Sequence, residues 1–358
     1  MSRIDIQLKK APTSASVIGS GFIALDIVHG RDGLFAATGG SCGNVLMTLA
    51  WLGWTSTPVA RLGCDKAGDF VVGDMKAAGA NLKFLQRSQA VPTPVVIQQF
   101  VEDPNGSRRH RFSLVCPECG AWLPRYRSVV LTHAHAVMEG VAPKAFYFDR
   151  TSPATVAMAE WAKKNGAVVF FEPSSIREDS LFERAVDACD ILKFSHERFS
   201  RDSELSQARG PQLVVRTMGP DGLQARWKGR WSSFAPFVAP RVVDAAGAGD
   251  WCSVALLHVL AQKGAQAFGT ARKTDIERAL RLGQALAALS CGFEGARGLM
   301  SAVNSVDRLN RMLRHVAGGG GVFDDVEVSG ARTAEVEICK LCSDSARTVA
   351  ATGKAKRA

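Results

Sequence analysis

Short runs of β-branched and aromatic residues alternate with longer segments of helical period between about residues 15 and 289. This alternation predicts an α/β domain with a mostly parallel sheet, since helical crossovers join parallel strands. The strands that we expect are Ser16–Ile18, Val95–Val101, Ala145–Phe148, Val168–Phe171, Ile191–Phe194 and Leu213–Thr217. The helices that we expect, each with apolar residues three and four positions apart, include Asn44–Trp51, Thr155–Lys164 and Asp275–Leu289.

One pair of strands carries its own turn signal. The tripeptide Pro-Asn-Gly at 104–106 separates the run Val95–Val101 from the run Arg111–Val115. A turn of this composition between two strand-like runs predicts an antiparallel hairpin. We expect this hairpin, at about residues 95–115, and further strands at about residues 20–40 to form a small β lid beside the main sheet.

The amino-acid composition is typical of a globular protein. Of 358 residues, 46% are hydrophobic and 22% are charged, which excludes intrinsic disorder as an overall description. Apolar runs such as Val254–Leu260 are far shorter than the roughly 20 residues that a membrane span requires. The first ten residues are mixed polar and lack the apolar stretch of a signal peptide. We therefore expect a cytoplasmic protein that does not bind a membrane.

A run of four glycines marks the expected end of the folded domain. Gly318–Gly321 has the composition of a flexible linker. We expect one domain over residues 14–317, followed by a linker and a basic tail over residues 318–358.

The segment V-V-D-A-A-G-A-G-D-W, residues 242–251, carries the strongest chemical signal. Its small residues let the backbone turn tightly, and the apolar helical stretch that follows points its unpaired N–H groups at the turn. Such a helix start favours a bound phosphate. Asp250 in the same turn is placed to accept a proton from a hydroxyl that attacks this phosphate. A tight strand-to-helix connection without a ligand is the competing interpretation.

These residues resemble a known signature. The stretch D-A-A-G-A-G-D at 244–250 is similar to D-T-x-G-A-G-D of the PfkB or ribokinase family of carbohydrate and nucleoside kinases, with Ala245 in place of the threonine. Four further segments resemble motifs of this family and follow in the family order, at residues 39–53, 61–69, 217–222 and 290–297. The resemblance spans roughly residues 14–314.

The resemblance implies a ribokinase-like three-layer sandwich with a mostly parallel central sheet and a β lid. It also implies ATP-dependent phosphoryl transfer, assisted by Mg²⁺, to a hydroxyl of a sugar or sugar derivative. Asp250 matches the catalytic base of the family. The backbone anion hole that stabilises the transferred phosphoryl group is matched by Gly247, Ala248 and Gly249.

Further binding residues carry over by position. The acceptor site is matched by Asp26, Gly39, Gly40 and Asn44. The ATP site is matched by Thr217 and Gly219. Asp244 resembles a residue that helps hold a monovalent cation in many members, and the loss of the adjacent threonine to Ala245 leaves this cation open.

The element of the family that organises Mg²⁺ and phosphate, N-x-x-E, is altered. In L-K-F-S-H-E-R, Ser195 stands in place of the asparagine and Arg198 in place of the glutamate. Glu197 supplies the missing carboxylate if the register shifts by one residue. If it does not, a degenerate kinase fold that only binds or regulates becomes the alternative to an enzyme. Within the enzyme class, a nucleoside kinase is the alternative to a sugar kinase.

Two Cys-x-x-Cys pairs fall outside the resemblance. Cys116 and Cys119 lie in C-P-E-C-G, at about residues 113–127, which has the form of a zinc knuckle. Cys339 and Cys342 form a second pair in the tail, so the two pairs together supply the ligands of a tetrahedral zinc site. The competing interpretations are a redox dithiol, a site completed by His133 or His135, which we expect on one side of a strand, and no metal.

The two Cys-pair segments also hold most of the positive charge. The whole chain carries a formal charge of +10, while residues 105–127 hold five Arg and one Glu, and residues 340–358 hold five Lys+Arg and one Asp. A basic zinc element flanked by Trp122 and Tyr126 predicts a weak nucleic-acid contact, with a structural clip as the alternative. The resemblance further implies a homodimer through the lids, which the knuckle insert leaves open.

Overall fold

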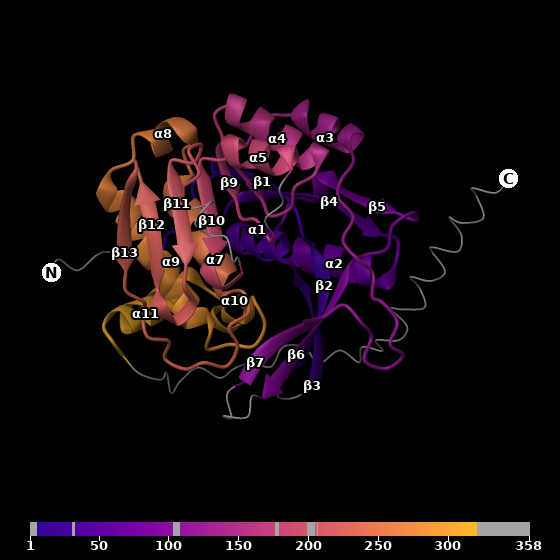
Figure 1. Ribbon diagram of the computed structural model, residues 1–358. Coiled ribbons are helices and arrows are strands. Elements are labelled where there is room, and N and C mark those ends of the chain that lie inside the picture. Colours follow the sequence, from indigo (N-terminus) through magenta and orange to yellow (C-terminus); the bar gives the residue numbers. More distant parts are fainter. Residues whose placement is uncertain are drawn as a thin grey trace.

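A computed structural model describes residues 6–30, 33–102, 108–175, 179–198, 205 and 207–320 of the chain (Figure 1). Nine strands form the main sheet in the order β13-β12-β11-β10-β9-β8-β1-β4-β5. The seven strands from β11 to β5 pair in parallel, whereas β12 and β13 add an antiparallel edge. Their bounds are β1 Ser16–Ser20, β4 Thr55–Gly63, β5 Leu85–Ser88, β8 Ala145–Phe148, β9 Val168–Phe171, β10 Ile191–Ser195, β11 Leu213–Thr217, β12 Leu223–Trp227 and β13 Arg230–Phe234.

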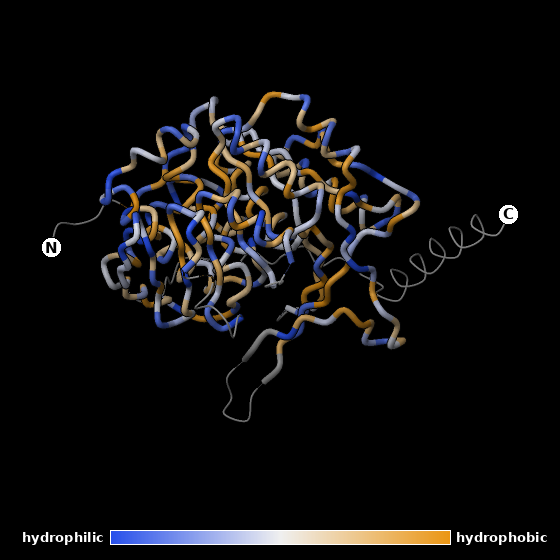
Figure 2. The backbone as a smooth tube through the Cα atoms, turned by 45° about the horizontal axis from the view of Figure 1, so that its top comes forward, coloured by the Kyte–Doolittle hydropathy of each residue, from blue (hydrophilic) through white to orange (hydrophobic). Residues whose placement is uncertain are grey.

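Helices cover both faces of this sheet and make a three-layer sandwich (Figure 1). Hydrophobic stretches of the chain gather in its interior (Figure 2), where the buried side chains form two apolar cores. The larger core contains α1 Ser41–Trp51, α2 Lys66–Ala77, α7 Ala248–Leu260, α8 Ala265–Gly269, α9 Lys273–Ser290, α10 Gly298–Val303 and α11 Val306–Ala317. The smaller core contains α3 Leu131–Met138, α4 Pro153–Lys164 and α5 Ser180–Ala188. Three short 3₁₀ turns are η1 Leu82–Phe84, η2 His196–Arg198 and η3 Gly219–Asp221.

The central strands explain why the sequence forms this architecture. Every residue of β8 and β9 is buried, so both strands are continuous apolar runs. Successive side chains point to opposite faces of a strand. Accordingly, Tyr147 packs in the larger core and its neighbour Phe146 in the smaller one. A parallel sheet covered on both faces requires such runs.

A second sheet of four strands forms the lid, in the order β3-β2-β6-β7, and projects from one side of the body (Figure 1). Its bounds are β2 Ala24–Gly30, β3 Gly33–Gly39, β6 Val95–Glu102 and β7 Arg108–Ser113. The predicted antiparallel pairing of β6 with β7 is confirmed. The second strand lies earlier than Arg111–Val115, because the chain after Ser113 turns into a separate tight hairpin that contains Cys116.

One local prediction is wrong. His133 and His135 lie in helix α3 rather than on a strand. Two positions along a helix correspond to about 200°, so the two rings face different ways: His133 is buried and His135 is exposed. They therefore form no histidine pair that could complete a metal site.

The N-terminal segment packs on the body ahead of the first strand. Leu8 is buried, and its backbone N–H and C=O bond to the side chain of Asn310 in α11 at 2.8 Å each. The tail that contains Cys339 and Cys342 lies outside the described residues. Within the part that the structure describes, no helix is long and apolar enough to cross a bilayer.

Candidate active site

The turn at residues 244–250 leads directly into α7. Gly247 caps the helix with a left-handed φ of 77°, and a Cβ at this position would lie 2.6 Å from Ala296, so only glycine fits. Ala248 N–H donates to Ala245 O at 3.3 Å. Among the described residues no carbonyl accepts the N–H of Gly249. The Gly249 amide at the start of α7 is therefore open to an anion.

Asp250 sits in the first turn of α7 and is buried. The Asn44 side chain, from the first turn of α1, donates Nδ2–H to Asp250 Oδ2 at 2.7 Å, and the Ser41 hydroxyl also hydrogen-bonds to this carboxylate. Burial, together with the nearby charge of Glu172, raises the pKa of Asp250 to about 6, while the hydrogen bond from Asn44 and the charge of Lys193 oppose the rise. A carboxyl with this pKa is ionised at neutral pH and can still accept a proton.

A buried ion pair lies directly beneath this turn. Lys193 in β10 pairs with Glu172, which follows β9, and only 2% of the Lys193 side chain is exposed. Ser253 Oγ and Tyr147 Oη donate to Glu172 Oε2 at 2.5 and 3.1 Å. A Cβ on Gly249 would lie 3.5 Å from Lys193 Nζ, so the pair touches the base of the turn. Hydroxyl donors and a counter-ion satisfy both oxygens of Glu172, as a buried charge requires.

Asp26 faces the same region from the lid strand β2. Its carboxylate lies against Gly39, where a Cβ would come within 1.8 Å of Oδ2, so glycine is required beside it. Burial raises the pKa of Asp26 to about 7, the Arg297 charge opposes this, and the charge of Asp250 adds to it. The carboxylates of Asp26 and Asp250 are thus close enough to interact electrostatically. Among the described residues no donor reaches Asn44 Oδ1, which leaves one acceptor open beside them.

The predicted nucleotide residues gather at the carboxyl ends of two neighbouring strands. Ser195 ends β10 and pairs in register with Thr217, which ends β11. Gly219 follows with a φ of 56°, and a Cβ there would lie 2.9 Å from Glu197 Oε1. The structure therefore places Glu197, rather than Arg198, against the residue matched to the ATP site. The altered N-x-x-E element keeps a carboxylate near this edge.

Asp244 holds the turn at its other end. It is buried, and its two oxygens accept N–H groups from Ala246, Gly295 and the side chain of Gln98. The Asp244 side chain thereby joins the turn to segments 51 and 146 positions away in the sequence.

Gly40, matched to the acceptor loop, has a φ of 80° and packs on the Phe22 carbonyl, where a Cβ would come within 2.3 Å.

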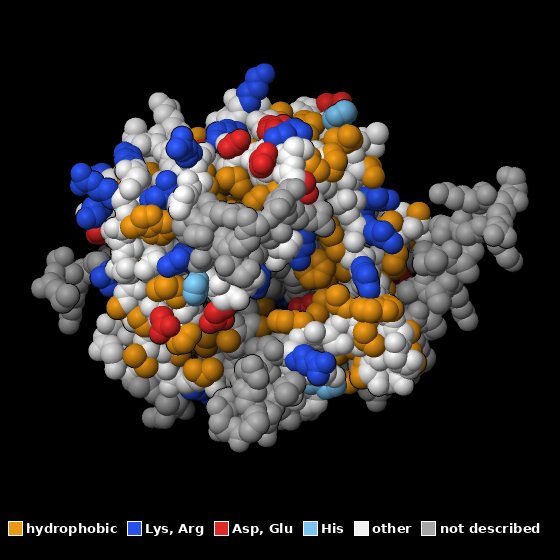
Figure 3. Space-filling model, viewed as in Figure 1, with side chains coloured by type: hydrophobic (Ala, Val, Ile, Leu, Met, Phe, Trp, Pro, Cys, Tyr) orange, Lys and Arg blue, Asp and Glu red, His pale blue; other side chains and the backbone are white. Residues whose placement is uncertain are grey.

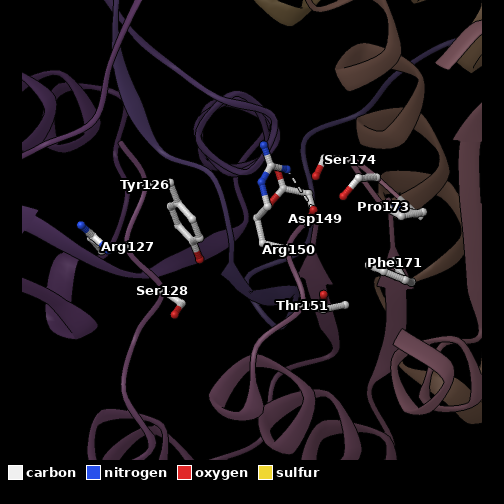
Figure 4. Close-up of a pocket in the computed structure, with 10 residues that line it drawn as sticks. Tyr126, Arg127, Ser128, Asp149, Arg150, Thr151, Phe171, Pro173 and Ser174 are labelled. Atoms are coloured by element: carbon white, nitrogen blue, oxygen red, sulfur yellow. Dashed lines mark hydrogen bonds and ion pairs between the residues drawn. The ribbon is translucent and has the colours of Figure 1, made fainter. Parts of the chain in front are cut away.

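A cavity of about 380 Å³ opens beside α1, at the carboxyl ends of β8 and β9 (Figure 4). Buried Asp149 forms its inner wall, and its side chain pairs with Arg150 at 3.2 Å. Asp149 also accepts the N–H of Phe22 at 2.8 Å and that of Cys42. Burial raises the pKa of Asp149, and Arg150 opposes this. The carboxylate thereby caps the start of the helix that carries Asn44.

The first Cys pair lies in a tight hairpin after the lid. Val115 bridges Trp122, Cys116 N–H donates to Ala121 O at 2.8 Å, and Gly120 takes a φ of 72°. Cys116 is buried and Cys119 is exposed. This is the turn that C-P-E-C-G predicts. Within the described residues no cluster of three or more metal-ligating side chains is present.

Lysine and arginine side chains are spread over the face of the molecule on which the lid meets the body (Figure 3). Trp122 is 64% exposed, and the Arg125 guanidinium stacks on its ring at 4.1 Å. Tyr126 instead packs edge-on against Phe22, with ring centroids 6.0 Å apart. The two aromatic residues considered for base stacking therefore do not form one platform.

Three further residues of the site carry no recognisable motif in the sequence. Lys193 interrupts the apolar strand I-L-K-F, and Glu172 directly follows the apolar run V-V-F-F. A charge in or next to a fully buried strand must be paired, and this was the available signal. Ser41 opens α1 next to the matched glycines. None of the three shares a local motif with Asp250.

The covered parallel sheet with its β lid is the ribokinase-like fold. The fructokinase with bound ATP from Xylella fastidiosa matches with a TM-score of 0.66 and 18% identity over 84% of this chain and 99% of that chain. A fructokinase double mutant from Vibrio cholerae O395, in a form with fructose, ADP and potassium ion bound, matches with a TM-score of 0.61 and 19% identity over 79% and 94%. The predicted fold class is confirmed.

Residues 35–302 match the pfkB family carbohydrate kinases, and the chain belongs to this family. It is 28% identical over 323 residues to the fructokinase of Klebsiella pneumoniae, with 83% of this chain and 98% of that protein covered. The prediction of a carbohydrate kinase is confirmed. The comparisons favour this activity over a nucleoside kinase and over a degenerate binding protein.

Proposed function

We propose that this carbohydrate kinase transfers the γ-phosphoryl group of ATP to a sugar hydroxyl, with Asp250 as the base. The observation that carries the proposal is the contact between Asn44 and Asp250, 2.7 Å, which brings the starts of α1 and α7 together. At this junction a carboxylate, an open amide oxygen and unpaired backbone N–H groups face one region. These are the groups that phosphoryl transfer to a hydroxyl requires.

In this mechanism Asp26 and Asn44 orient the acceptor, with Asn44 Oδ1 accepting a hydrogen bond from a sugar hydroxyl. The reacting hydroxyl gives its proton to Asp250 while its oxygen bonds to the γ-phosphorus. The bond from this phosphorus to the bridging oxygen of ADP breaks, and the electron pair leaves with ADP. The amides of Gly247 and Gly249, for which no carbonyl among the described residues is an acceptor, stabilise the charge on the transferred group. The Ala248 amide joins them by sharing its hydrogen between Ala245 O and the phosphoryl group.

The nucleotide occupies the edge formed by Ser195, Thr217 and Gly219. Glu197 is exposed beside Gly219, and a carboxylate oxygen there is a suitable hard ligand for Mg²⁺ or for its bound water. Mg²⁺ would neutralise charge on the ATP phosphates when bound. Glu172 is a poor alternative ligand because Lys193 and the hydroxyls of Ser253 and Tyr147 engage its oxygens.

The names of the relatives suggest where to look for the acceptor. The Klebsiella protein is a fructokinase, so a ketohexose is the first acceptor to test. The panel should also include aldoses, sugar phosphates, sugar acids and nucleosides. ADP release is measured for each acceptor, and Asp250→Asn, which keeps the shape of the side chain, is the control.

We expect at least one sugar to give turnover and Asp250→Asn to lower kcat by about 100-fold or more, the usual contribution of a general base. Thermal unfolding shows whether the variant is folded. Binding of ATP without turnover on any acceptor would contradict the proposal. So would an Asp250→Asn protein with the kcat of the wild type.

We also propose a structural zinc ion held by Cys116 and Cys119 with Cys339 and Cys342. The support is the knuckle-like hairpin around the first pair and the matching spacing of the second, which lies outside the described residues. Zinc content by mass spectrometry should fall from one ion per chain to none in Cys339→Ser/Cys342→Ser. Cys64→Ser, at another exposed cysteine, is the matched control and should keep its zinc.

Three related proposals concern partners and boundaries. A weak nucleic-acid contact would use the basic segments at 105–127 and 340–358, and RNA binding that falls with salt would test it. A lid-to-lid homodimer is tested by the mass of the protein in solution. The domain over 14–317 with its tail over 318–358 is tested by limited proteolysis, with cleavage expected in the glycine run.

A further inference from the structure

The carboxylate of Asp244 joins three segments by hydrogen bonds. Its Oδ1 accepts the N–H of Ala246 at 2.5 Å, two residues along the same turn. Its Oδ2 accepts the N–H of Gly295 at 2.7 Å, from the loop after α9, and the amide of Gln98 at 3.0 Å, from lid strand β6. Asp244 is 1% exposed, so these contacts are made away from solvent. Ala246, Gly295 and Gln98 therefore place N–H groups around one buried negative charge.

The backbone oxygens around Asp244 also accept N–H groups. Ala245 O accepts from Ala248, and Cys291 O accepts from Val243 at 2.7 Å and from Asp244 at 3.0 Å. Oxygens of the second loop are engaged as well: Gly292 O accepts from Arg241, Gly295 O from Gly298 and Ala296 O from Trp251. The hydrogens of these donors point at the oxygens. A cation that bound to these five oxygens would have to share each of them with a partial positive charge.

The two loops also pack directly on each other. A Cβ at Gly247 would lie 2.6 Å from the Cα, Cβ and O atoms of Ala296. Close packing of this kind leaves the turn little freedom to open for an ion. Ala245, which stands where the family has a threonine, contributes no side-chain oxygen.

Gln98 reaches the turn from the lid. It is 1% exposed and pairs in register with Val28 of β2, two positions beyond the pair formed by Val96 and Asp26. Residues that pair across two strands lie on the same face of a sheet, and so do residues two positions apart on one strand. Gln98 therefore lies on the same lid face as Asp26, which we assign to the acceptor. Its amide nitrogen must face Asp244, because the amide oxygen would repel the carboxylate.

Asp244 resembles a residue that helps hold a monovalent cation in many members of the family, and the Vibrio fructokinase structure contains potassium. In this chain N–H groups surround the Asp244 carboxylate and five nearby backbone oxygens already accept N–H groups, so these residues are a poor fit for such an ion. We propose that the amide of Gln98 takes the place of the cation: it is a positioning residue that fixes Asp244, and through it the anion-hole turn, without a metal. This inference rests on the proposed role of the turn at 244–250.

Two consequences follow from the exchange of an ion for an amide. The turn is ordered whether or not potassium is present, so catalysis is independent of alkali cations. Because Gln98 belongs to the lid, the same contact also ties the lid to the turn that binds the phosphoryl group. Loss of the amide leaves Asp244 one donor short and loosens both elements.

The wild type and Gln98→Ala are compared in potassium chloride and in choline chloride at equal ionic strength. We expect the wild type to have the same kcat and the same melting temperature in both salts. Gln98→Ala should lose kcat more than it raises the KM for the acceptor, since the anion hole acts in the transition state. Gln99→Ala, one position along on the opposite face of β6, is the matched control.

Gln98→Glu gives a second arm that does not depend on turnover. Two carboxylates that share a site repel each other unless a cation or a proton lies between them. We expect this variant to melt at a higher temperature in potassium chloride than in choline chloride, in contrast to the wild type. Activation of the wild type by potassium of about fivefold or more would overturn the proposal. So would wild-type kinetics in folded Gln98→Ala.

These measurements distinguish a failure of the proposed kinase function from a failure of the inference about Gln98. If Asp250→Asn retains activity, or if no acceptor gives turnover, the assignment of the turn is wrong. The melting temperatures of the wild type and Gln98→Glu still report on the cation in that case. A melting temperature of the wild type that rises specifically with potassium would overturn the exchange of the cation for Gln98 on its own.

Discussion

Asn44 Nδ2 donates a 2.7 Å hydrogen bond to Asp250 Oδ2, although the two residues lie 206 positions apart. The bond joins the first turn of α1 to the first turn of α7, so two helix starts face one region. Asn44 stabilises the charged form of Asp250, and its own oxygen stays open. The orientation of the base and the position of the acceptor thereby depend on one amide group.

Replacing Asn44 should move the titration of Asp250. Its hydrogen bond lowers the pKa of Asp250, so Asn44→Leu should raise this pKa from about 6. The acid limb of the pH profile of kcat/KM then shifts to higher pH, since the base must be ionised. Asn81→Ala, at an asparagine that caps η1, is the control and should leave the profile unchanged. An unshifted limb in folded Asn44→Leu would contradict the assignment of Asp250.

Glu172 should act on Asp250 in the opposite direction. Its negative charge raises the pKa of Asp250, so Glu172→Gln should lower this pKa and shift the acid limb of kcat/KM to lower pH. Glu160→Gln, which removes an exposed glutamate paired with Arg184, is the matched control. A shift of the acid limb to higher pH in Glu172→Gln would show that the charge of Glu172 does not raise the pKa of Asp250.

Lys193→Met should destabilise the protein strongly, because it leaves the Glu172 carboxylate buried without its counter-ion. Loss of one partner of a buried pair costs about 3–5 kcal/mol. The double variant Glu172→Gln/Lys193→Met should recover much of this loss, since no unpaired charge remains. Urea unfolding of the two single variants and the double variant measures the coupling. Additive losses would mean that the pair is not coupled in the folded protein.

Asp26 should make stability depend on pH. Its pKa is raised from 3.8 to about 7 in the folded state, so the fold favours the protonated carboxyl. The contribution of this group to the free energy of unfolding is fully present below pH 4 and is lost as the pH rises through 7. Asp26→Asn removes this loss and should stabilise the fold by about 1–3 kcal/mol at pH 8, and by less at pH 5. It should also raise the KM for the acceptor. Unfolding at both pH values tests the sign, and equal effects at both would contradict the raised pKa.

Gly247→Ala should disrupt the turn. The left-handed φ of 77° and the 2.6 Å approach to Ala296 both exclude a side chain. We expect a loss of stability of about 1–3 kcal/mol from backbone strain, together with a lower kcat. Gly269→Ala is the control, because nothing lies within 4 Å of a Cβ there. Equal melting temperatures for the two variants would show that the turn can relax.

Local sequence patterns identified the central strands because those strands are buried on both faces. β8 and β9 have the predicted bounds, since a continuous apolar run between polar turns has few alternatives. The second strand of the β6–β7 hairpin was placed too late, because the apolar residues Leu114 and Val115 resemble the end of a strand whereas residues 108–110 are basic. His133 and His135 were misplaced, since a short mixed segment carries no clear period.

The sequence by itself determined the class of kinase and the turn at 244–250, and it predicted Asp250 as the base. Tight turns and helix starts are local structures, so consecutive residues specify them. The tertiary structure decided what surrounds that carboxylate: Asn44 beside it, Glu172 and Lys193 beneath it, and Gln98 at the far end of the turn. Each comes from a different element, and they meet because parallel strands and the helices between them bring their ends to one edge of the sheet. Burial and charge at that edge depend on packing, which no single stretch of sequence contains.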